Sequence, residues 1–450
     1  MKTIRKQYEH YFSEKYLKGV FQDNVVYSGG TGIDNINQYT FRKHQDEQIA
    51  ILSRKMIAGQ YSFTKYKLNL ISKGRGKAPR EISIPTVRDR IGLRALCDFL
   101  QERFSNSVEF QLPQTVVREI KDSIATGNHT GVIKLDVSNF YPSVNHTLLA
   151  KQLNKRLRKH PDIVRVIFSA ISVPTVSKPS KTDARNTKGV PQGLSISNIL
   201  AAIYLQELDR FLKSIPNTKT YRYVDDILIL CDFEEAEDIS KQVISRFKKD
   251  DLEIHCPVQI PHKSMIAEID EEFDYLGYLF HDEIVSVKKG SIEKLKSSLV
   301  SLFTSYKYSK TQSKEFLTWR LDLRITGCVF ENKSKGWLFF FSEINDERIL
   351  HQLDHFVAKL CKRFDVADIK TKKFVRALKE ITNRKYETRY VPNFDNATKK
   401  EKANILAKYF SFNLKKMTDE EIHFHFHKKV AHQIKDLEAD IKDFSSSANS

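Results

Sequence analysis

The chain has 450 residues, of which 40% are hydrophobic and 11% aromatic, a composition that excludes a disordered chain and allows more than one structural unit. Its formal net charge of +18 indicates a polyanionic partner, and nucleic acid is the usual one. The sequence has neither the apolar start of a signal peptide nor the run of roughly 18 apolar residues that a membrane span requires. The five cysteines show no CxxC spacing, so we expect free thiols in a reducing cytoplasm.

The first part of the chain predicts helices and then a basic loop. Residues 1–70 carry helical patterns and are predicted to be an N-terminal helical extension, to which the sequence assigns no function. A basic, glycine-containing loop over residues 72–80 leads into a predicted strand at 81–85. A helix follows from residue 86, with Arg88 and Arg94 expected to follow a nucleic-acid backbone.

An apolar run at residues 132–135 predicts a buried strand that ends in a carboxylate, Asp136. The aromatic residues Phe140 and Tyr141 follow in a predicted turn. A single aspartate at the end of a strand is commonly a helix cap or a loop residue. Asp136 alone therefore does not indicate a catalytic or metal-binding site.

The next stretch connects this strand to a glycine-flanked glutamine. Residues 146–158 and 163–171 predict two helices, and the polar residues 177–188 predict a loop that is mobile or ordered by a partner. Gln192 then lies between Gly189 and Gly193, which allow the backbone to approach a substrate closely.

Residues 220–231 predict a β-hairpin, because β-branched and aromatic residues alternate on both sides of an aspartate pair. The predicted turn is Asp225-Asp226. Two carboxylates about 4 Å apart repel by roughly 4 kcal/mol at an effective dielectric constant near 20. A solvated surface turn tolerates such a pair, whereas a pair between hydrophobic strands indicates a bound cation. Together with Asp136, the pair would suit two Mg²⁺ ions about 3.5–4 Å apart.

Three stretches, taken in this order, resemble the three central palm motifs of reverse transcriptases. They are Val-Ile-Lys-Leu-Asp-Val-Ser-Asn-Phe-Tyr (132–141), Gly-Val-Pro-Gln-Gly-Leu-Ser-Ile-Ser-Asn (189–198) and Arg-Tyr-Val-Asp-Asp (222–226). One YxDD sequence is weak evidence, but three motifs in the order of the family are specific. The layout is similar to the prokaryotic branch, which comprises retrons, group II intron enzymes and antiphage-defence reverse transcriptases.

The resemblance implies an α+β fold, the right-hand polymerase. Fingers and palm would occupy residues 71–285, with an antiparallel palm sheet that has helices on one face. A helical thumb would follow at 286–390, and a charged helical C-terminal extension with a disordered end at 391–450. Residues 273–280 resemble the hairpin that grips the primer end.

The C-terminal half supplies fewer specific signals. Arg320, Arg324 and Trp337 combine charge with an aromatic ring and are expected to contact a template–primer duplex, although Trp337 also fits a core position. Thr418 and the acidic residues after it predict a capping box that opens a long helix. The histidines at 423, 425 and 427 lack the pattern of a metal site and favour a packed or solvated helix.

In the family, the carboxylates of the palm motifs hold the metal ions. Asp136 and Asp225 are implied to bind two Mg²⁺ ions, for which Mn²⁺ can substitute, with Val137 as a further metal contact and Asp226 as the weaker ligand. Lys263 is implied to protonate the leaving pyrophosphate, and a merely solvated lysine is the alternative.

The resemblance also implies four nucleotide-binding residues. Lys77 and Arg80 would bind the triphosphate, and Gln192 would lie near the sugar and the template base. Tyr141 would collide with a ribose 2′-hydroxyl, so the product would be DNA. The alternatives are a solvated hairpin tip for the two cations and a core aromatic residue for Tyr141.

We therefore expect an RNA-directed DNA polymerase that joins dNTPs to a primer 3′-hydroxyl or a protein hydroxyl. An untemplated or protein-primed DNA polymerase would keep every motif, an RNA-dependent RNA polymerase would share the carboxylates, and a non-catalytic nucleic-acid-binding protein would need only the charge. The sequence after residue 285 shows neither an obvious RNase H carboxylate array nor a zinc-endonuclease spacing, which favours an antiphage-defence enzyme. Its expected partners are an RNA template, a DNA product and a noncoding RNA, a second protein or a second copy of the chain. We expect it in the cytoplasm and away from membranes.

Overall fold

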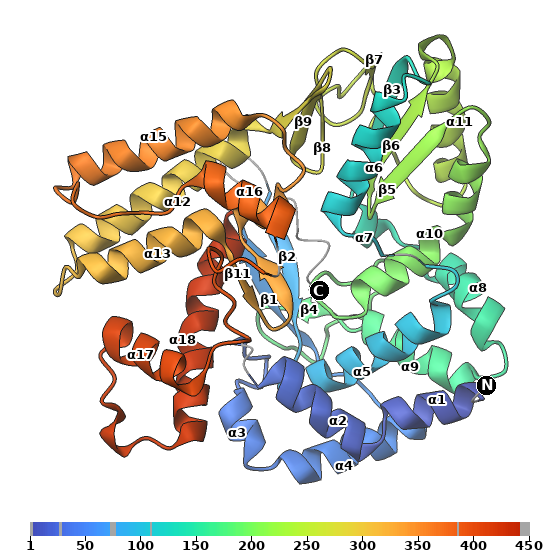
Figure 1. Ribbon diagram of the computed structural model, residues 1–450. Coiled ribbons are helices and arrows are strands. Elements are labelled where there is room, and N and C mark those ends of the chain that lie inside the picture. The colour runs from blue at the N-terminus through green and yellow to red at the C-terminus, as the bar shows by residue number, and fades with distance from the viewer. Residues whose placement is uncertain (1–2, 27–28, 73–77, 109, 385–386, 442–450) are drawn as a thin grey trace. The chain divides into compact units, whose positions relative to one another are not determined.

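The computed structural model describes residues 3–26, 29–72, 78–108, 110–384 and 387–441. They form two compact units. The first comprises the described residues of Met1–Gln111 and Gly131–Ile266, and the second comprises those of Leu112–Thr130 and Ala267–Ser446. Figure 1 labels many of their helices and strands.

The N-terminal helices of the first unit share its main core. They are α1 (Ile4–Tyr11), α2 (Glu14–Val20), a short π-helix (Phe21–Val25), α3 (Gln38–Arg42), α4 (Gln45–Ile57) and α5 (Val87–Phe104). Tyr8, Leu17 and Ile49 are fully buried in the same cluster as Ile91 of α5 and Leu135 of the central sheet. The helices between Ile4 and Ile57 pack their apolar residues into this core.

A small sheet follows in the first unit. Its strands are β1 (Tyr66–Ile71), β2 (Arg80–Ile84) and β4 (Thr175–Val176), in the order β2-β1-β4. β1 pairs antiparallel with β2 and parallel with β4. The helices between β3 and β4 are α7 (Phe140–Ser143), α8 (His146–Leu157) and α9 (Pro161–Ile171). The strand predicted at 81–85 is therefore confirmed and begins at Arg80.

The central sheet of the first unit has the order β5-β6-β3-β7. The strands are β3 (Gly131–Asp136), β5 (Lys219–Tyr223), β6 (Asp226–Cys231) and β7 (Met265–Glu268). β6 pairs antiparallel with both β3 and β5. Because side chains alternate along a strand, Ile133 and Leu135 of β3 and Ile227 and Ile229 of β6 share one face, and all four belong to the main core.

Two helices complete this core. They are α10 (Ser197–Ser214) and α11 (Ala236–Lys248), which follows the short 3₁₀ helix Phe233–Glu235. α10 contacts β5 and α11 contacts β3, and Figure 1 shows both helices, in green, beside the sheet. The predicted α+β fold, with helices on one face of an antiparallel sheet, is confirmed.

The second unit is mostly helical. Its elements are α6 (Pro113–Ala125), the sheet of β8 (Phe273–Tyr275), β9 (Tyr278–His281) and β10 (Ile284–Val287), α12 (Lys289–Lys307), α13 (Lys314–Thr326), the hairpin of β11 (Cys328–Phe330) and β12 (Lys333–Lys335), α14 (Trp337–Phe340), α15 (Glu347–Arg363), α16 (Phe374–Arg384), α17 (Lys399–Phe410), the 3₁₀ helix Leu414–Lys416 and α18 (Asp419–Ala439). The hairpin predicted at 273–280 is confirmed. Its loop residues Leu276 and Gly277 both have positive φ, of +49° and +83°.

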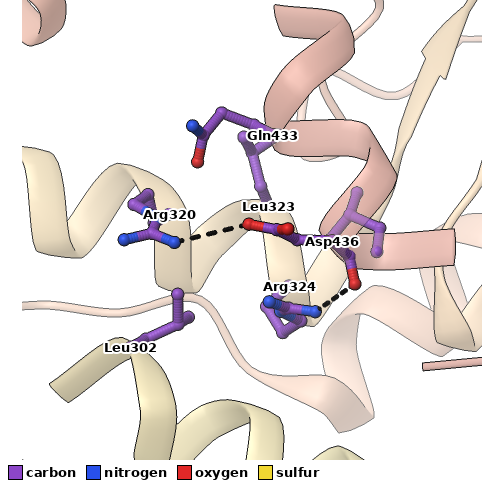
Figure 2. Close-up of a pocket in the computed structure, with 7 residues that line it drawn as sticks. Leu302, Arg320, Leu323, Arg324, Gln433 and Asp436 are labelled. Atoms are coloured by element: carbon purple, nitrogen blue, oxygen red, sulfur yellow. Dashed lines mark hydrogen bonds and ion pairs between the residues drawn. The ribbon is translucent and has the colours of Figure 1, made fainter. Parts of the chain in front are cut away.

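Two residues predicted to touch nucleic acid lie inside the second unit. Trp337 is 1% exposed and donates a hydrogen bond from Nε1 to Ser291 Oγ at 3.2 Å, so the core alternative is confirmed. Arg324 is 5% exposed, and its Nη1 donates to Asp440 Oδ2 at 2.5 Å. The predicted contact of Arg324 with a duplex is wrong, because its charge is satisfied within the protein. Figure 2 shows Arg320 and Arg324 of α13 facing α18, where Arg320 pairs with Asp436 at 3.5 Å.

The C-terminal helices pack against α13 and β11. The predicted capping box at Thr418 is confirmed, since its side chain accepts from the amide of Glu421 and the Glu421 carboxylate accepts from the amide of Thr418. His427 Nε2 lies 3.0 Å from Glu331 Oε1, and His423 Nδ1 lies 3.2 Å from Lys402 Nζ. These histidines form local polar contacts, as the packed-helix interpretation predicts.

Candidate active site

The two central strands of the first unit end in facing carboxylates. Asp136, the last residue of β3, is the cross-strand partner of Asp226, the first residue of β6. The amide of Val137 donates to the carbonyl of Asp225 at 3.3 Å, which ties the end of β3 to the adjoining turn. Three carboxylates from two distant segments therefore meet at one end of the sheet.

The turn that carries Asp225 differs by one residue from the predicted one. Tyr223 pairs with Asp226, so the two loop residues are Val224 and Asp225 rather than Asp225 and Asp226. Two-residue hairpin loops require a positive φ, and Val224 has φ of +56°. The prediction placed the turn at the polar pair, whereas pairing with β3 makes Asp226 a strand residue.

Burial and mutual repulsion make the paired aspartates hard to ionise. Burial raises the pKa of Asp225, and the nearby Asp136 raises it further, while Arg80 and Lys263 oppose the shift. Burial, followed by the charges of Asp225 and Asp136, raises the pKa of Asp226 to about 8. A bound cation would relieve this cost, since it favours the ionised carboxylates.

Lys263 lies beside the first carboxylate. Its Nζ is 3.0 Å from Asp136 Oδ2, and His255 Nε2 is 3.5 Å from the same oxygen. Ser264 is fully buried, and its Oγ accepts a hydrogen bond from the amide of Asp136 at 3.0 Å. The amide of His255 also donates to the carbonyl of Asp136 at 3.0 Å. The segment after β6 and α11 thus holds Asp136 at both its backbone and its carboxylate.

Tyr141 packs against the core and hydrogen-bonds to α10. Its ring is partly buried against the main core, and its hydroxyl is 2.5 Å from Asn198 Oδ1 at the start of α10. Burial raises its pKa, the charge of Asp225 adds to the shift, and Arg80 opposes it. The Tyr141 ring thus packs against the core and also lies within electrostatic reach of Asp225, so the two interpretations of this residue remain open.

The glycine-flanked turn packs against β2. Gly193 has φ of +97°, and a Cβ there would lie 2.7 Å from Ile82 Cγ2. The carbonyl of Gln192 accepts a hydrogen bond from the amide of Ser83 at 2.7 Å. Only glycine allows this approach. Gln192 is thereby fixed next to the strand that begins at Arg80.

Arg80 is half-buried at the start of β2, where it is the cross-strand partner of Ile71. Its charge opposes the rise in the pKa of Asp225 and in that of Tyr141, so its guanidinium lies within electrostatic reach of both groups. Lys77, the second predicted triphosphate ligand, lies outside the described residues. The structure thus brings Arg80, Tyr141, Asp136, Asp225 and Asp226 together.

Residues 71–280 match the family model "Reverse transcriptase (RNA-dependent DNA polymerase)". The chain contains a reverse transcriptase domain. All three motifs lie within the matched segment, as does the four-stranded sheet that carries the carboxylates. The predicted family is confirmed for this domain.

Two curated relatives align with parts of the chain. Protein YkfC from Escherichia coli K12 is 27% identical over 192 residues, which cover 40% of this chain and 49% of that protein. The group II intron-encoded protein LtrA from Lactococcus lactis is 23% identical over 286 residues, which cover 60% of this chain and 46% of that protein. The chain thus spans about half the length of the curated relatives it matches.

Solved telomerases also align with the chain. The apo telomerase from Candida tropicalis has a TM-score of 0.44 at 14% identity and covers 90% of this chain and 72% of that chain. The telomerase from Candida albicans, in complex with the TWJ fragment of telomeric RNA, has a TM-score of 0.43 at 14% identity and covers 92% and 71%.

The reverse transcriptase domain offers oxygen donors that fit a hard divalent cation. Asp136, Asp225 and Asp226 supply carboxylates whose ionisation is disfavoured in its absence. Within the described ranges, no group of three or more His, Cys, Asp or Glu side chains converges closely enough to hold a metal ion by itself. Mg²⁺ in polymerase sites is usually bound by one or two carboxylates together with substrate phosphates and waters. The donor set therefore fits a cation that binds with the nucleotide.

Several contact residues of the reverse transcriptase domain were not predicted from the sequence. They are Asn198, Asp209, Arg222, His255 and Ser264. Asn198 and Arg222 lie inside the motifs at 189–198 and 222–226, and Ser264 follows Lys263, so their positions in the sequence indicated only weakly that they belong to the site. Asp209 had none, because its partner lies across a helix–strand contact.

None of the described helices is long and apolar enough to cross a bilayer.

Proposed function

We propose that this chain is an RNA-directed DNA polymerase that joins dNTPs to a primer 3′-hydroxyl or to a protein hydroxyl. The observation that carries the proposal is the meeting of Asp136, Asp225 and Asp226 at one end of the palm sheet. The charge of Arg80, from another segment, opposes the rise in the pKa of Asp225, and the charge of Asp225 raises the pKa of Tyr141. The family match over residues 71–280 supports the same reaction.

Two Mg²⁺ ions, for which Mn²⁺ can substitute, would be held by Asp136, Val137 and Asp225, with Asp226 as the weaker ligand. When bound, such ions activate the attacking hydroxyl and stabilise the leaving oxygen. The backbone contacts of Asp136 with Ser264 and His255 keep its carboxylate at the end of β3. The raised pKa values of Asp225 and Asp226 mean that their ionised forms are unfavourable without a cation, and a bound cation would stabilise those ionised forms.

The remaining side chains bind and orient the nucleotide. Arg80 and Lys77 would pair with the triphosphate, and cations in this position stabilise charge on the transferred group. Lys263 would donate a proton to the leaving pyrophosphate, which suits its position 3.0 Å from Asp136 Oδ2. Tyr141, held by Asn198, would exclude a ribose 2′-hydroxyl, and Gln192 would contact the sugar and template base.

The partners and the biological role belong to the same proposal. We propose an RNA template, a DNA product and a role in antiphage defence with a noncoding RNA, a partner protein or a second copy of the chain. The net charge of +18 supports a nucleic-acid partner. Residues 286–390 would act as the thumb, which agrees with their helical content. The cytoplasmic location remains a prediction.

The experiment that tests the proposal uses the purified full chain with its co-purifying nucleic acid. Labelled dNTPs and Mg²⁺ are added, and the product is sequenced. DNA complementary to a bound RNA is the expected result, and Asp225→Asn should abolish it while the fold is retained. Low-complexity DNA that matches no template would indicate an untemplated polymerase instead. RNA product would indicate an RNA polymerase, and no product with added primer and template would overturn the proposal.

A further inference from the structure

The turn that carries Asp225 holds an unfavourable backbone conformation. Val224 has φ of +56°, in the left-handed region that β-branched residues rarely adopt. A residue in such a conformation persists only where surrounding contacts hold it there. The contacts that hold Val224 therefore also decide where the adjoining carboxylate points.

Arg222, two residues earlier in the same hairpin, supplies such a contact. Its Nη1 donates a hydrogen bond to the carbonyl oxygen of Val224 at 2.8 Å. Its Nε and Nη2 donate to Oδ1 and Oδ2 of Asp209 at 2.5 and 2.7 Å. The guanidinium is planar, so the two-point contact with Asp209 also fixes the direction of the N–H that reaches Val224.

Asp209 is part of a rigid support. It lies on α10, whose apolar residues Leu205, Leu208 and Leu212 are at most 2% exposed. The side chains of Arg222 and Asp209 are 15% and 29% exposed, so water and salt screen this pair less than a surface pair. α10 also carries Asn198, which holds the Tyr141 hydroxyl. One helix thus anchors both the turn and Tyr141, the residue predicted to exclude a ribose 2′-hydroxyl.

We propose that Arg222 is a positioning residue for the reaction. Anchored by Asp209, it fixes the Val224 carbonyl and, through the strained turn, the direction of the Asp225 carboxylate. This inference rests on the proposed function, since it assigns Arg222 a part in that same site. Arg222 acts through Val224 and Asp225, and substrate contact is left to residues such as Arg80.

The first test compares kinetic constants for dNTP incorporation on a defined primer–template. Arg222→Gln should lower kcat by about 10–100-fold, because a small displacement of a reacting group has effects of this size. The KM for dNTP should stay within about threefold, since the triphosphate contacts are untouched. Asp209→Asn should lower kcat in the same direction. The matched control is Arg246→Gln, which breaks a pair with Asp250 at 2.6 Å and 27% and 26% exposure but leaves the turn alone.

The second test asks whether the strain is what Arg222 controls. Asparagine tolerates the left-handed region far better than valine, so Val224→Asn gives a turn that needs less support. Arg222→Gln should therefore cost clearly less in the Val224→Asn background than in the wild type. An equal loss in both backgrounds would contradict the role assigned to Arg222. This comparison also guards against Arg222→Gln failing through misfolding alone, because a folding defect would persist in both backgrounds.

The third test needs no polymerase activity. Amide hydrogen exchange of residues 219–231, measured without substrate, should be about tenfold or more faster in Arg222→Gln and unchanged in Arg246→Gln. If the wild type makes no product under any condition, the proposed function fails, and this measurement still decides whether Arg222 orders the turn. Unchanged exchange together with unchanged kcat would overturn the inference.

Discussion

Lys263 allows the chemical and structural roles of one side chain to be separated. Its Nζ lies 3.0 Å from Asp136 Oδ2, and the two side chains are 48% and 15% exposed. An exposed pair of this kind contributes about 0.2–1 kcal/mol to stability. Loss of a general acid costs about 10²–10⁴ in rate, which corresponds to about 3–5 kcal/mol in the activation barrier. Lys263→Gln should therefore slow incorporation far more than it destabilises the fold.

The assay is single-nucleotide incorporation by rapid quench at saturating dNTP, together with urea unfolding of the same variants. Lys263→Arg separates two explanations of the slow variant. Arginine keeps the charge beside Asp136 but does not release its proton near neutral pH. If Lys263 is the acid, the arginine variant should be nearly as slow as Lys263→Gln. If Lys263 only holds Asp136, the arginine variant should recover most of the rate.

The control is Lys241→Gln, which removes a lysine that pairs with Glu237 at 2.8 Å on the surface of α11. Its incorporation rate should match the wild type. A Lys263→Gln rate within about threefold of the wild type would refute the acid role, because general-acid catalysis typically contributes at least 10². A loss of more than about 2 kcal/mol of unfolding free energy would refute the estimate of a weak, exposed pair.

Three further outcomes are expected. Tyr141→Ala, which removes the ring held by Asn198, should reduce discrimination between dNTP and rNTP by at least about tenfold, and competition between the two nucleotides measures it. Gly193→Ala should lower activity by about tenfold or more, since its Cβ would meet Ile82 Cγ2 at 2.7 Å and its positive φ disfavours alanine; steady-state kinetics checks this. Burial raises the pKa of Asp89, so its contribution to stability is fully present below about pH 4 and is lost as pH rises through the folded-state pKa. Urea unfolding at pH 4 to 7 should show a steeper fall in the wild type than in Asp89→Asn, in which Asp225 and Asp226 still contribute, and parallel profiles would contradict it.

The sequence by itself predicted the residues proposed to carry the chemistry of the site. The apolar run before Asp136, the glycines around Gln192 and the alternation around Asp225 are local patterns, and each predicts its element without knowledge of the rest of the chain. The long helices could be predicted for the same reason, since their apolar patterns repeat over several turns. The three motifs also carried the family resemblance, which the match over residues 71–280 confirms.

Only the tertiary structure decided how these elements meet. Pairing of β6 with β3 shifts the turn by one residue and makes Asp226 the partner of Asp136, a register that no local pattern encodes. Burial of Trp337 and the contact of Arg222 with Asp209 depend on which surfaces pack together. Local propensity acts over a few residues, whereas register and burial are set by contacts between segments far apart in the chain, and those contacts place the carboxylates within reach of one another.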